Sequence, residues 1–178
     1  MIRRAALCGA LGLGVLASPA RAMPYHFTLY DGQGQMVTAD SFPGRLLLVF
    51  FGYTHCPDIC PATLEHLAKA LQTADPQGKK LQGLFISIDP AEDSPALASA
   101  YAALFSRRII GLSGSASDIA AAEREFHVYV RPLADGGFAH GALIYALDDQ
   151  GQLRAVIPDG LSTAQLSQRL SALLANGH

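Results

Sequence analysis

The sequence predicts an α/β fold of three layers, with a central mixed sheet and an added N-terminal hairpin. Two unbroken apolar runs, residues 46–51 (LLLVFF) and 84–88 (LFISI), are typical of strands that are covered on both faces. Segments with the apolar spacing of amphipathic helices lie between these runs and after them. Central buried strands linked by helices indicate three layers, and we expect residues 25–175 to form one domain.

Two hairpins complete this expected fold. Residues 142–147 and 153–157 flank an Asp-Asp-Gln-Gly turn, and their lengths are typical of an antiparallel pair. Residues 26–30 and 36–38 flank an Asp-Gly-Gln-Gly turn in the same way. We therefore expect one hairpin at the side of the sheet and a shorter one at the N-terminus.

Four helices are predicted from their apolar faces and from the residues that favour helix starts. Ser94 is an N-cap candidate followed by proline in the first turn. Ser162 and Gln165 have the spacing of a capping box. The other two helices are expected to begin at Cys60 and near residues 115–118.

Composition and charge exclude several classes of function. Of the 178 residues, 50% are hydrophobic and 16% are charged, which suits one packed core and argues against extended disorder. The formal net charge is −2, and no cluster of Lys and Arg occurs. We therefore expect no nucleic-acid partner. We also expect the protein to be a monomer.

Residues 1–22 have the pattern of a signal peptide that is cleaved on export. Arg3 and Arg4 precede an apolar stretch over residues 5–17, and Ser-Pro-Ala-Arg-Ala at 18–22 supplies a small-x-small cleavage pattern. The stretch is shorter than the ~20 residues that span a bilayer, so an uncleaved anchor is the less favoured alternative. The expected location is the periplasmic side of a bacterial inner membrane, with membrane contact only through a partner or an uncleaved signal.

Beyond the predicted signal, which contains Cys8, the sequence has two cysteines, Cys56 and Cys60. A disulfide between them would close too small a loop to add much stability, so the pair indicates chemistry. Proline follows each cysteine, and a residue before proline is disfavoured in the helical region. We expect Cys60 as a helix N-cap and Pro61 as the first helical residue. Both sulfurs then lie near the positive end of the helix, which favours thiolate.

The spacing of the two cysteines leaves two interpretations open. Redox enzymes of the thioredoxin kind use two intervening residues, whereas this sequence has three. The longer loop still permits a disulfide but leaves more room for both sulfurs to face one ion. Two soft thiolates suit Cu(I), zinc or an iron–sulfur centre, and such a site needs a further ligand.

His140 is the candidate for that further ligand. It lies in residues 134–141 (ADGGFAHG), which open directly into a hydrophobic strand, and loops at strand ends carry functional groups in α/β proteins. Position alone does not distinguish a ligand from an ordinary loop histidine. His66 is expected on a solvated helix surface and His127 at an ordinary strand position. His55 is expected to point away from the neighbouring cysteine.

Three segments resemble the Sco/SenC family of copper-binding proteins. Residues 51–64 (FGYTHCPDICPATL) closely resemble the copper-site motif of that family. Residues 87–95 (SIDPAEDSP) are similar to its strand-end segment. His140, followed by residues 144–148 (IYALD), resembles its distal histidine and next strand. The likeness extends over nearly the whole predicted domain.

The resemblance implies a thioredoxin-like fold and one copper ion, Cu(I) or Cu(II), bound by Cys56, Cys60 and His140. It also implies a role in assembling the binuclear copper centre of cytochrome c oxidase, by delivering copper or by reducing the cysteines of that centre. The family usually has Asp before its histidine and Ser or Thr after it, where this sequence has Ala139 and Gly141. A side-chain partner that would orient the imidazole is therefore missing.

The favoured function is a copper metallochaperone, which is not an enzyme. The alternative is an exported thiol–disulfide oxidoreductase, in which Cys56 is the nucleophile and Cys60 is the resolving cysteine. Expected partners are the copper-site subunit of cytochrome c oxidase or another copper protein, and a periplasmic copper donor or thiol reductant.

Peroxide reduction, for which Thr54 is suitably placed, fits the paired cysteines poorly. A closed zinc or iron–sulfur site normally takes four ligands and is not favoured. Three acidic residues lie around the expected site, namely Asp58, Asp89 and Asp93. They are interpreted as solvated loop and cap residues rather than as docking groups.

Overall fold

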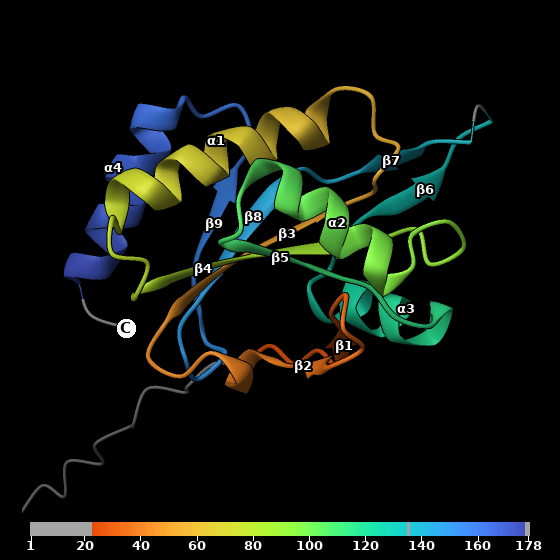
Figure 1. Cartoon of the computed structure of the whole chain (residues 1–178), viewed down its shortest axis with the longest axis horizontal. Helices are drawn as coiled ribbons and strands as arrows, with labels where there is room; N and C mark the ends of the chain where they lie inside the picture. The colour runs from red at the N-terminus through yellow and green to blue at the C-terminus, as the bar shows by residue number, and fades with distance from the viewer. Residues whose placement is uncertain (1–22, 135, 177–178) are drawn as a thin grey trace, which may run out of the picture.

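The computed structural model describes residues 23–134 and 136–176. A five-stranded sheet lies at its centre, with the strand order β5-β4-β3-β8-β9 (Figure 1). β3, β4 and β5 run parallel, whereas β8 is antiparallel to β3 and β9 is antiparallel to β8. The strands are β3 (Leu46–Gly52), β4 (Leu81–Ser87), β5 (Ile109–Leu112), β8 (Leu143–Leu147) and β9 (Leu153–Pro158). The predicted mixed sheet is confirmed.

Helices and a small hairpin cover the two faces of this sheet (Figure 1). One face carries α1 (Ile59–Ala74), α2 (Pro95–Phe105) and α4 (Thr163–Ala175). The other face carries α3 (Ala116–Glu125) together with the antiparallel pair β1 (Leu29–Tyr30) and β2 (Met36–Val37), followed by the short helix η1 (Ala39–Ser41). The three layers and the N-terminal hairpin are therefore as predicted.

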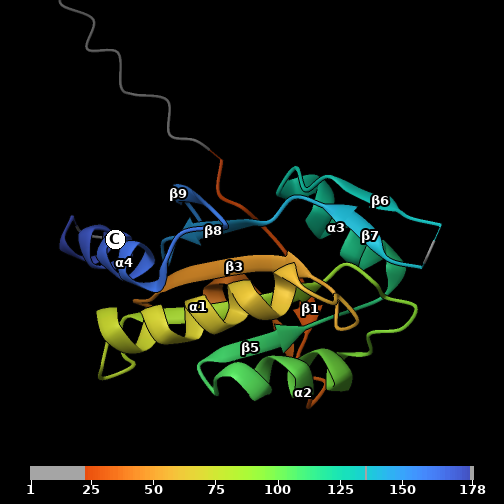
Figure 2. The ribbon, with the colours of Figure 1, turned by 90° about the horizontal axis from the view of Figure 1, so that it is seen from above.

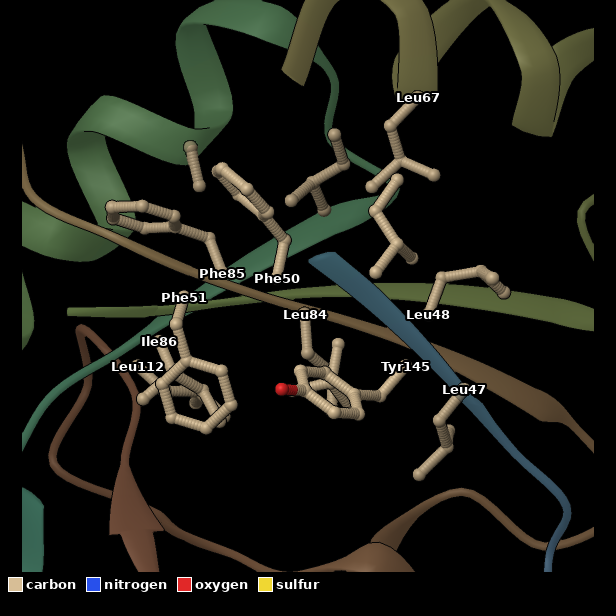
Figure 3. Close-up of a cluster of buried hydrophobic side chains, with 14 of the residues drawn as sticks. Leu47, Leu48, Phe50, Phe51, Leu67, Leu84, Phe85, Ile86, Leu112 and Tyr145 are labelled. Carbon is tan, nitrogen blue, oxygen red and sulfur yellow. The ribbon is translucent and has the colours of Figure 1, made fainter. Parts of the chain in front are cut away.

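The core lies on both sides of β3, as Figure 3 shows. Leu48 and Phe50 point toward the helices on one face, while Leu47 and Phe51 point to the opposite face. All four side chains are at most 1% exposed. Successive residues of a strand alternate between its faces, so an unbroken apolar run is required when both faces are covered.

Side-chain caps fix three of the four helix starts where the sequence predicts them. Ser94, Ser115 and Ser162 each accept a hydrogen bond from a backbone N–H of the first turn. The start of α1 differs from the prediction: its N-cap is Asp58, and Cys60 lies inside the first turn. Pro61 is tolerated at the third helical position because the N–H at this position has no partner within the helix.

A third hairpin, β6 (Val130–Pro132) paired with β7 (Phe138–His140), is missing from the sequence prediction. It lies at the same end of the molecule as the loop that leads from β3 into α1 (Figure 1, Figure 2). The expected strand position of His127 is wrong, because this residue ends α3 with a φ of 53°. The N–H of His127 and the N–H of Val128 bond carbonyls of the last turn of α3, the pattern that terminates many helices.

The predicted signal peptide, residues 1–22, lies outside the described residues. Among the described residues, no helix combines the length and the apolar character that a membrane span requires.

Candidate metal centre

The two cysteines lie where β3 ends and α1 begins, at the carboxyl end of the parallel strands. This is the edge at which α/β proteins bind ligands. Gly52 closes β3 directly beneath the sulfur of Cys60. A Cβ atom on this residue would lie 2.8 Å from Cys60 Sγ and 3.1 Å from a ring carbon of Phe85. Only glycine therefore leaves room for the Cys60 sulfur in this position.

Cys56 is 8% exposed, and its sulfur accepts a hydrogen bond from the backbone N–H of Cys60 at 3.4 Å. Burial alone would raise the pKa of the Cys56 thiol. Hydrogen bonds from the Cys60 thiol and from backbone N–H groups at the start of α1 outweigh burial, so this pKa is lowered. The helix start thus favours the thiolate at Cys56, as the sequence predicts.

Cys60 has the opposite electrostatic environment. Its side chain is fully buried, and this burial raises the pKa of the thiol strongly. The neighbouring Cys56 raises it further, first because the Cys60 thiol donates a hydrogen bond to the Cys56 sulfur and then because two negative sulfurs repel each other. Both cysteines are free thiols in the structure. A soft metal ion bound by both sulfurs at neutral pH therefore displaces the proton of Cys60.

His140 ends β7 and faces the cysteines from across the site. Its Nε2 atom lies 3.7 Å from Cys60 Sγ, and its Nδ1 atom lies 3.2 Å from the carbonyl oxygen of Gly141. A carbonyl only accepts hydrogen bonds, so Nδ1 carries the proton and Nε2 keeps a free lone pair. Burial lowers the pKa of the imidazole, which favours the neutral ring that metals require. The Gly141 carbonyl thus replaces the side-chain partner that the sequence lacks.

The three predicted ligands come together in one cluster. One ligand atom from each of Cys56, Cys60 and His140 lies within 4.8 Å of the other two. With metal–sulfur and metal–nitrogen bonds of about 2.3 and 2.0 Å, a trigonal site needs separations of about 3.7–4.0 Å between its ligand atoms. Small side-chain rotations reach this geometry. Within residues 23–134 and 136–176, no other group of three or more Cys, His, Asp or Glu side chains converges in this way.

A cleft gives access to this cluster from solvent. It has a volume of about 430 Å³, and both Cys56 and His140 contribute to its walls. Two large apolar side chains beside it, Ile59 and Tyr129, are 44% and 60% exposed. The site is therefore open on one side, and apolar surface borders its mouth.

Asp93 is a functional residue whose role the sequence did not reveal. It is fully buried rather than solvated, which corrects the interpretation of this aspartate as a surface residue. Its carboxylate accepts the N–H of Thr54 at 2.9 Å, the hydroxyl of Thr54 at 2.5 Å and the hydroxyl of Ser87 at 2.7 Å. Asp89 is also buried, at 8% exposed, whereas Asp58 is exposed as expected. Asp93 therefore ties the cysteine loop to the end of β4.

The other histidines within residues 23–134 and 136–176 lie outside the cluster. His55 is largely exposed, and its Nδ1 lies 3.8 Å from a carboxylate oxygen of Asp93. His66 differs from the expectation of a solvated surface, because it is half-buried and its Nδ1 lies 3.2 Å from the carbonyl oxygen of Leu161. His66 thus links α1 to the loop before α4. A local pattern on α1 cannot reveal this contact, because the partner lies 95 residues away.

The chain is similar over most of its length to proteins of one family. A sequence model of the family described as SCO1/SenC matches residues 17–175. The protein SCO2 homolog, mitochondrial, of Bos taurus is 36% identical over 148 residues, which cover 82% of this chain and 54% of that protein. The chain spans about half the length of the curated relatives it matches.

Solved structures similar to this chain include three with copper bound. The crystal structure of Arabidopsis thaliana ScoI with copper bound matches with a TM-score of 0.82 at 28% identity, covering 87% of this chain and 99% of that one. Bradyrhizobium japonicum ScoI with copper bound matches with a TM-score of 0.75 at 34% identity, covering 85% and 99%. At 20% identity, BsSco is described as a member of the Sco family of cytochrome c oxidase assembly proteins. The predicted thioredoxin-like fold and the family resemblance are confirmed.

The expected periplasmic location is contradicted by the curated relatives. The matching proteins from Bos taurus and Saccharomyces cerevisiae are named as mitochondrial proteins, not as proteins of a bacterial inner membrane. The expectation depended only on the basic start and the apolar stretch of residues 1–22. Such a pattern does not specify one membrane system.

Proposed function

The chain belongs to the SCO1/SenC family, and from this premise we propose that it is a metallochaperone that carries one copper ion. The ligands in this proposal are Cys56, Cys60 and His140. The observation that supports it most is the convergence of these three side chains within 4.8 Å, although 80 residues separate Cys60 from His140. The copper-bound structures of similar proteins support copper as the ion.

The donor set suits copper as a transferable ion. Two thiolates and one neutral imidazole are soft to intermediate ligands that hold Cu(I) and also accommodate Cu(II). The site is open to the cleft, so a cysteine of an incoming protein can reach the ion and replace these ligands one at a time. The proposed recipient is the copper-site subunit of cytochrome c oxidase or another copper protein, and it contacts the apolar surface around Ile59 and Tyr129.

A thiol–disulfide oxidoreductase remains the second candidate function. Two free cysteines lie together in the structure, and the lowered pKa of the Cys56 thiol suits a nucleophile. This activity would reduce the cysteines of a copper-site partner and has no need of His140. Peroxide reduction is less well supported, because the hydroxyl of Thr54 donates to Asp93.

His140→Ala separates the two candidate functions. We expect the Cu(I) affinity to fall by on the order of a thousandfold, by analogy with structural zinc sites, in which binding energies of about 10–16 kcal/mol are shared among a few thiolate and imidazole ligands. Reduction of a model disulfide by the same variant should be unchanged under the oxidoreductase function. The measurements are copper stoichiometry by competition with a Cu(I) chelator, and disulfide reduction at equal protein concentration.

The matched control is His66→Ala, which removes a histidine from α1 outside the cluster. This variant should keep the wild-type copper affinity. If His140→Ala also keeps it, the proposed ligand set is wrong. If His140→Ala loses copper but still reduces the model disulfide, the protein has both capacities.

Gly52→Ala tests the space that Cys60 needs. The added methyl group would lie 2.8 Å from Cys60 Sγ, so the sulfur must move away from its position beside His140. We expect the Cu(I) affinity to fall by about 10–100-fold, the loss typical of misplaced ligands. The same chelator competition measures it, and urea unfolding of the metal-free protein reports whether the fold is retained. Wild-type affinity in a folded Gly52→Ala protein would contradict the tight packing described here.

A further inference from the structure

Tyr53 connects the two halves of the metal centre. It follows Gly52 at the end of β3 and is 6% exposed. Its hydroxyl oxygen accepts the backbone N–H of Phe138 at 3.4 Å, so it bonds the strand that carries His140. Tyr53 and Cys56 both line the cleft at the metal centre. Burial raises the pKa of Tyr53 most, and the Cys56 thiol raises it further.

The ring of Tyr53 makes contacts that fix the position of this hydroxyl. It packs edge-on against the ring of Phe138, with centroids 5.2 Å apart and an interplanar angle of 70°. It also packs edge-on against the imidazole of His140, with centroids 5.9 Å apart and an angle of 79°. Buried aromatic rings in such arrangements hold defined orientations. The ring contacts therefore hold the hydroxyl in one position, beside the backbone N–H of Phe138.

A phenol has one hydrogen to donate and lone pairs to accept. Because the N–H of Phe138 can only donate, the hydroxyl hydrogen of Tyr53 is available for the Cys56 sulfur. The backbone N–H of Cys60 reaches the same sulfur from the start of α1. When the sulfur is a thiolate, a hydroxyl donor at this position is charge-assisted and stronger than a neutral hydrogen bond.

We propose that the Tyr53 hydroxyl is a positioning group that donates to the Cys56 sulfur and thereby shifts the bound copper toward Cu(I). This inference rests on the proposed copper function. A thiolate carries more negative charge on Cu(I) than on Cu(II), so a hydrogen-bond donor stabilises the Cu(I) state more. Hydrogen bonds around a cysteine sulfur tune copper potentials in this way. In this inference Cys56 and His140 remain ligands of the copper ion.

Tyr53→Phe tests this inference, because it removes the hydroxyl and keeps the ring. The affinity for Cu(II) relative to Cu(I) should rise by roughly tenfold, the effect of one hydrogen bond to a charged group. For a one-electron couple, this fold-change lowers the potential of the bound copper by about 59 mV. The sulfur-to-Cu(II) charge-transfer band should also move to lower energy. Potentiometry with redox mediators and absorption spectroscopy measure the two effects.

The matched control is Tyr101→Phe. Tyr101 packs against Phe85 and Phe105, and its hydroxyl is the one buried side-chain polar atom without a hydrogen-bond partner in residues 23–134 and 136–176. Tyr101→Phe should therefore leave the potential and the band unchanged. If Tyr53→Phe behaves like this control, the inference is wrong. It is also wrong if Tyr53→Phe loses copper altogether, since one hydroxyl hydrogen bond is too weak to hold or release the ion.

Hydrogen exchange in the metal-free protein provides a readout that does not depend on copper. The amide of Phe138 should exchange faster in Tyr53→Phe than in the wild type, because its acceptor is gone. If the wild-type protein binds no copper, the proposed function fails, while the exchange rate still tests the hydroxyl bridge. If the amide exchanges faster but the copper potential is unchanged, Tyr53 is a structural link only, and the tuning role is overturned.

Discussion

Cys60→Ser is expected to abolish Cu(I) binding at any concentration relevant to transfer. The hydroxyl of serine does not ionise at neutral pH and is a hard ligand, so the ion keeps one thiolate and one imidazole. If binding energies of about 10–16 kcal/mol are shared among three ligands, one ligand contributes on the order of a thousandfold in affinity. Competition with a Cu(I) chelator measures the loss.

The fold of Cys60→Ser should survive this change. Serine is smaller than cysteine and fits beneath His140, where burial of a hydroxyl lowers the unfolding free energy by about 1–3 kcal/mol. Urea unfolding of the metal-free variant checks this. A folded Cys60→Ser protein with wild-type copper affinity would remove Cys60 from the ligand set.

Asp93→Ala is expected to cause the largest loss of stability among the changes at this site. It leaves the N–H of Thr54 and the hydroxyl of Ser87 buried without their acceptor, and it opens a cavity at a fully buried position. Together these effects should lower the unfolding free energy by about 3–5 kcal/mol. The cysteine loop loses its link to β4, so the copper affinity should fall as well.

Two variants control for Asp93→Ala. In Asp93→Asn the hydroxyl of Thr54 can rotate to accept from the new amide, so less than half of the loss is expected. Glu92→Ala changes the exposed neighbouring carboxylate and should alter the unfolding free energy by no more than about 0.5 kcal/mol. Urea unfolding of the three variants provides the comparison. Equal losses in Asp93→Ala and Glu92→Ala would contradict the role of this buried carboxylate.

The sequence predicted those parts of the fold that local patterns specify. The run at β3 is apolar over residues 46–51, where both faces are covered, and β4 is apolar at most of its buried positions. Ser94, Ser115 and Ser162 cap helices through contacts within four residues. Short strands were harder to predict. β6 and β7 contain only three residues each, which is too few for a period to be recognised, and a proline ends β6.

The candidate site was predicted only in part, because its supporting contacts join distant segments. The cysteine pair is a local motif, whereas His140 is a candidate from its loop position and is distinguished as a ligand only through the family resemblance. The burial of Asp93 depends on Thr54, 39 residues away, and the role of Tyr53 depends on Phe138, 85 residues away. Neither contact leaves a periodic signal in the sequence. Asp93 was misinterpreted because an aspartate before Ser-Pro has the composition of an ordinary helix cap.

The proposed function requires that two sulfurs at a helix start and one imidazole from a distant hairpin share a single copper ion. Copper K-edge X-ray absorption of the Cu(I)-loaded protein tests it most directly by counting neighbouring atoms. We expect two sulfur neighbours and one nitrogen neighbour, with the nitrogen lost in His140→Ala. A wild-type spectrum with sulfur neighbours alone, or one that His140→Ala leaves unchanged, would contradict it.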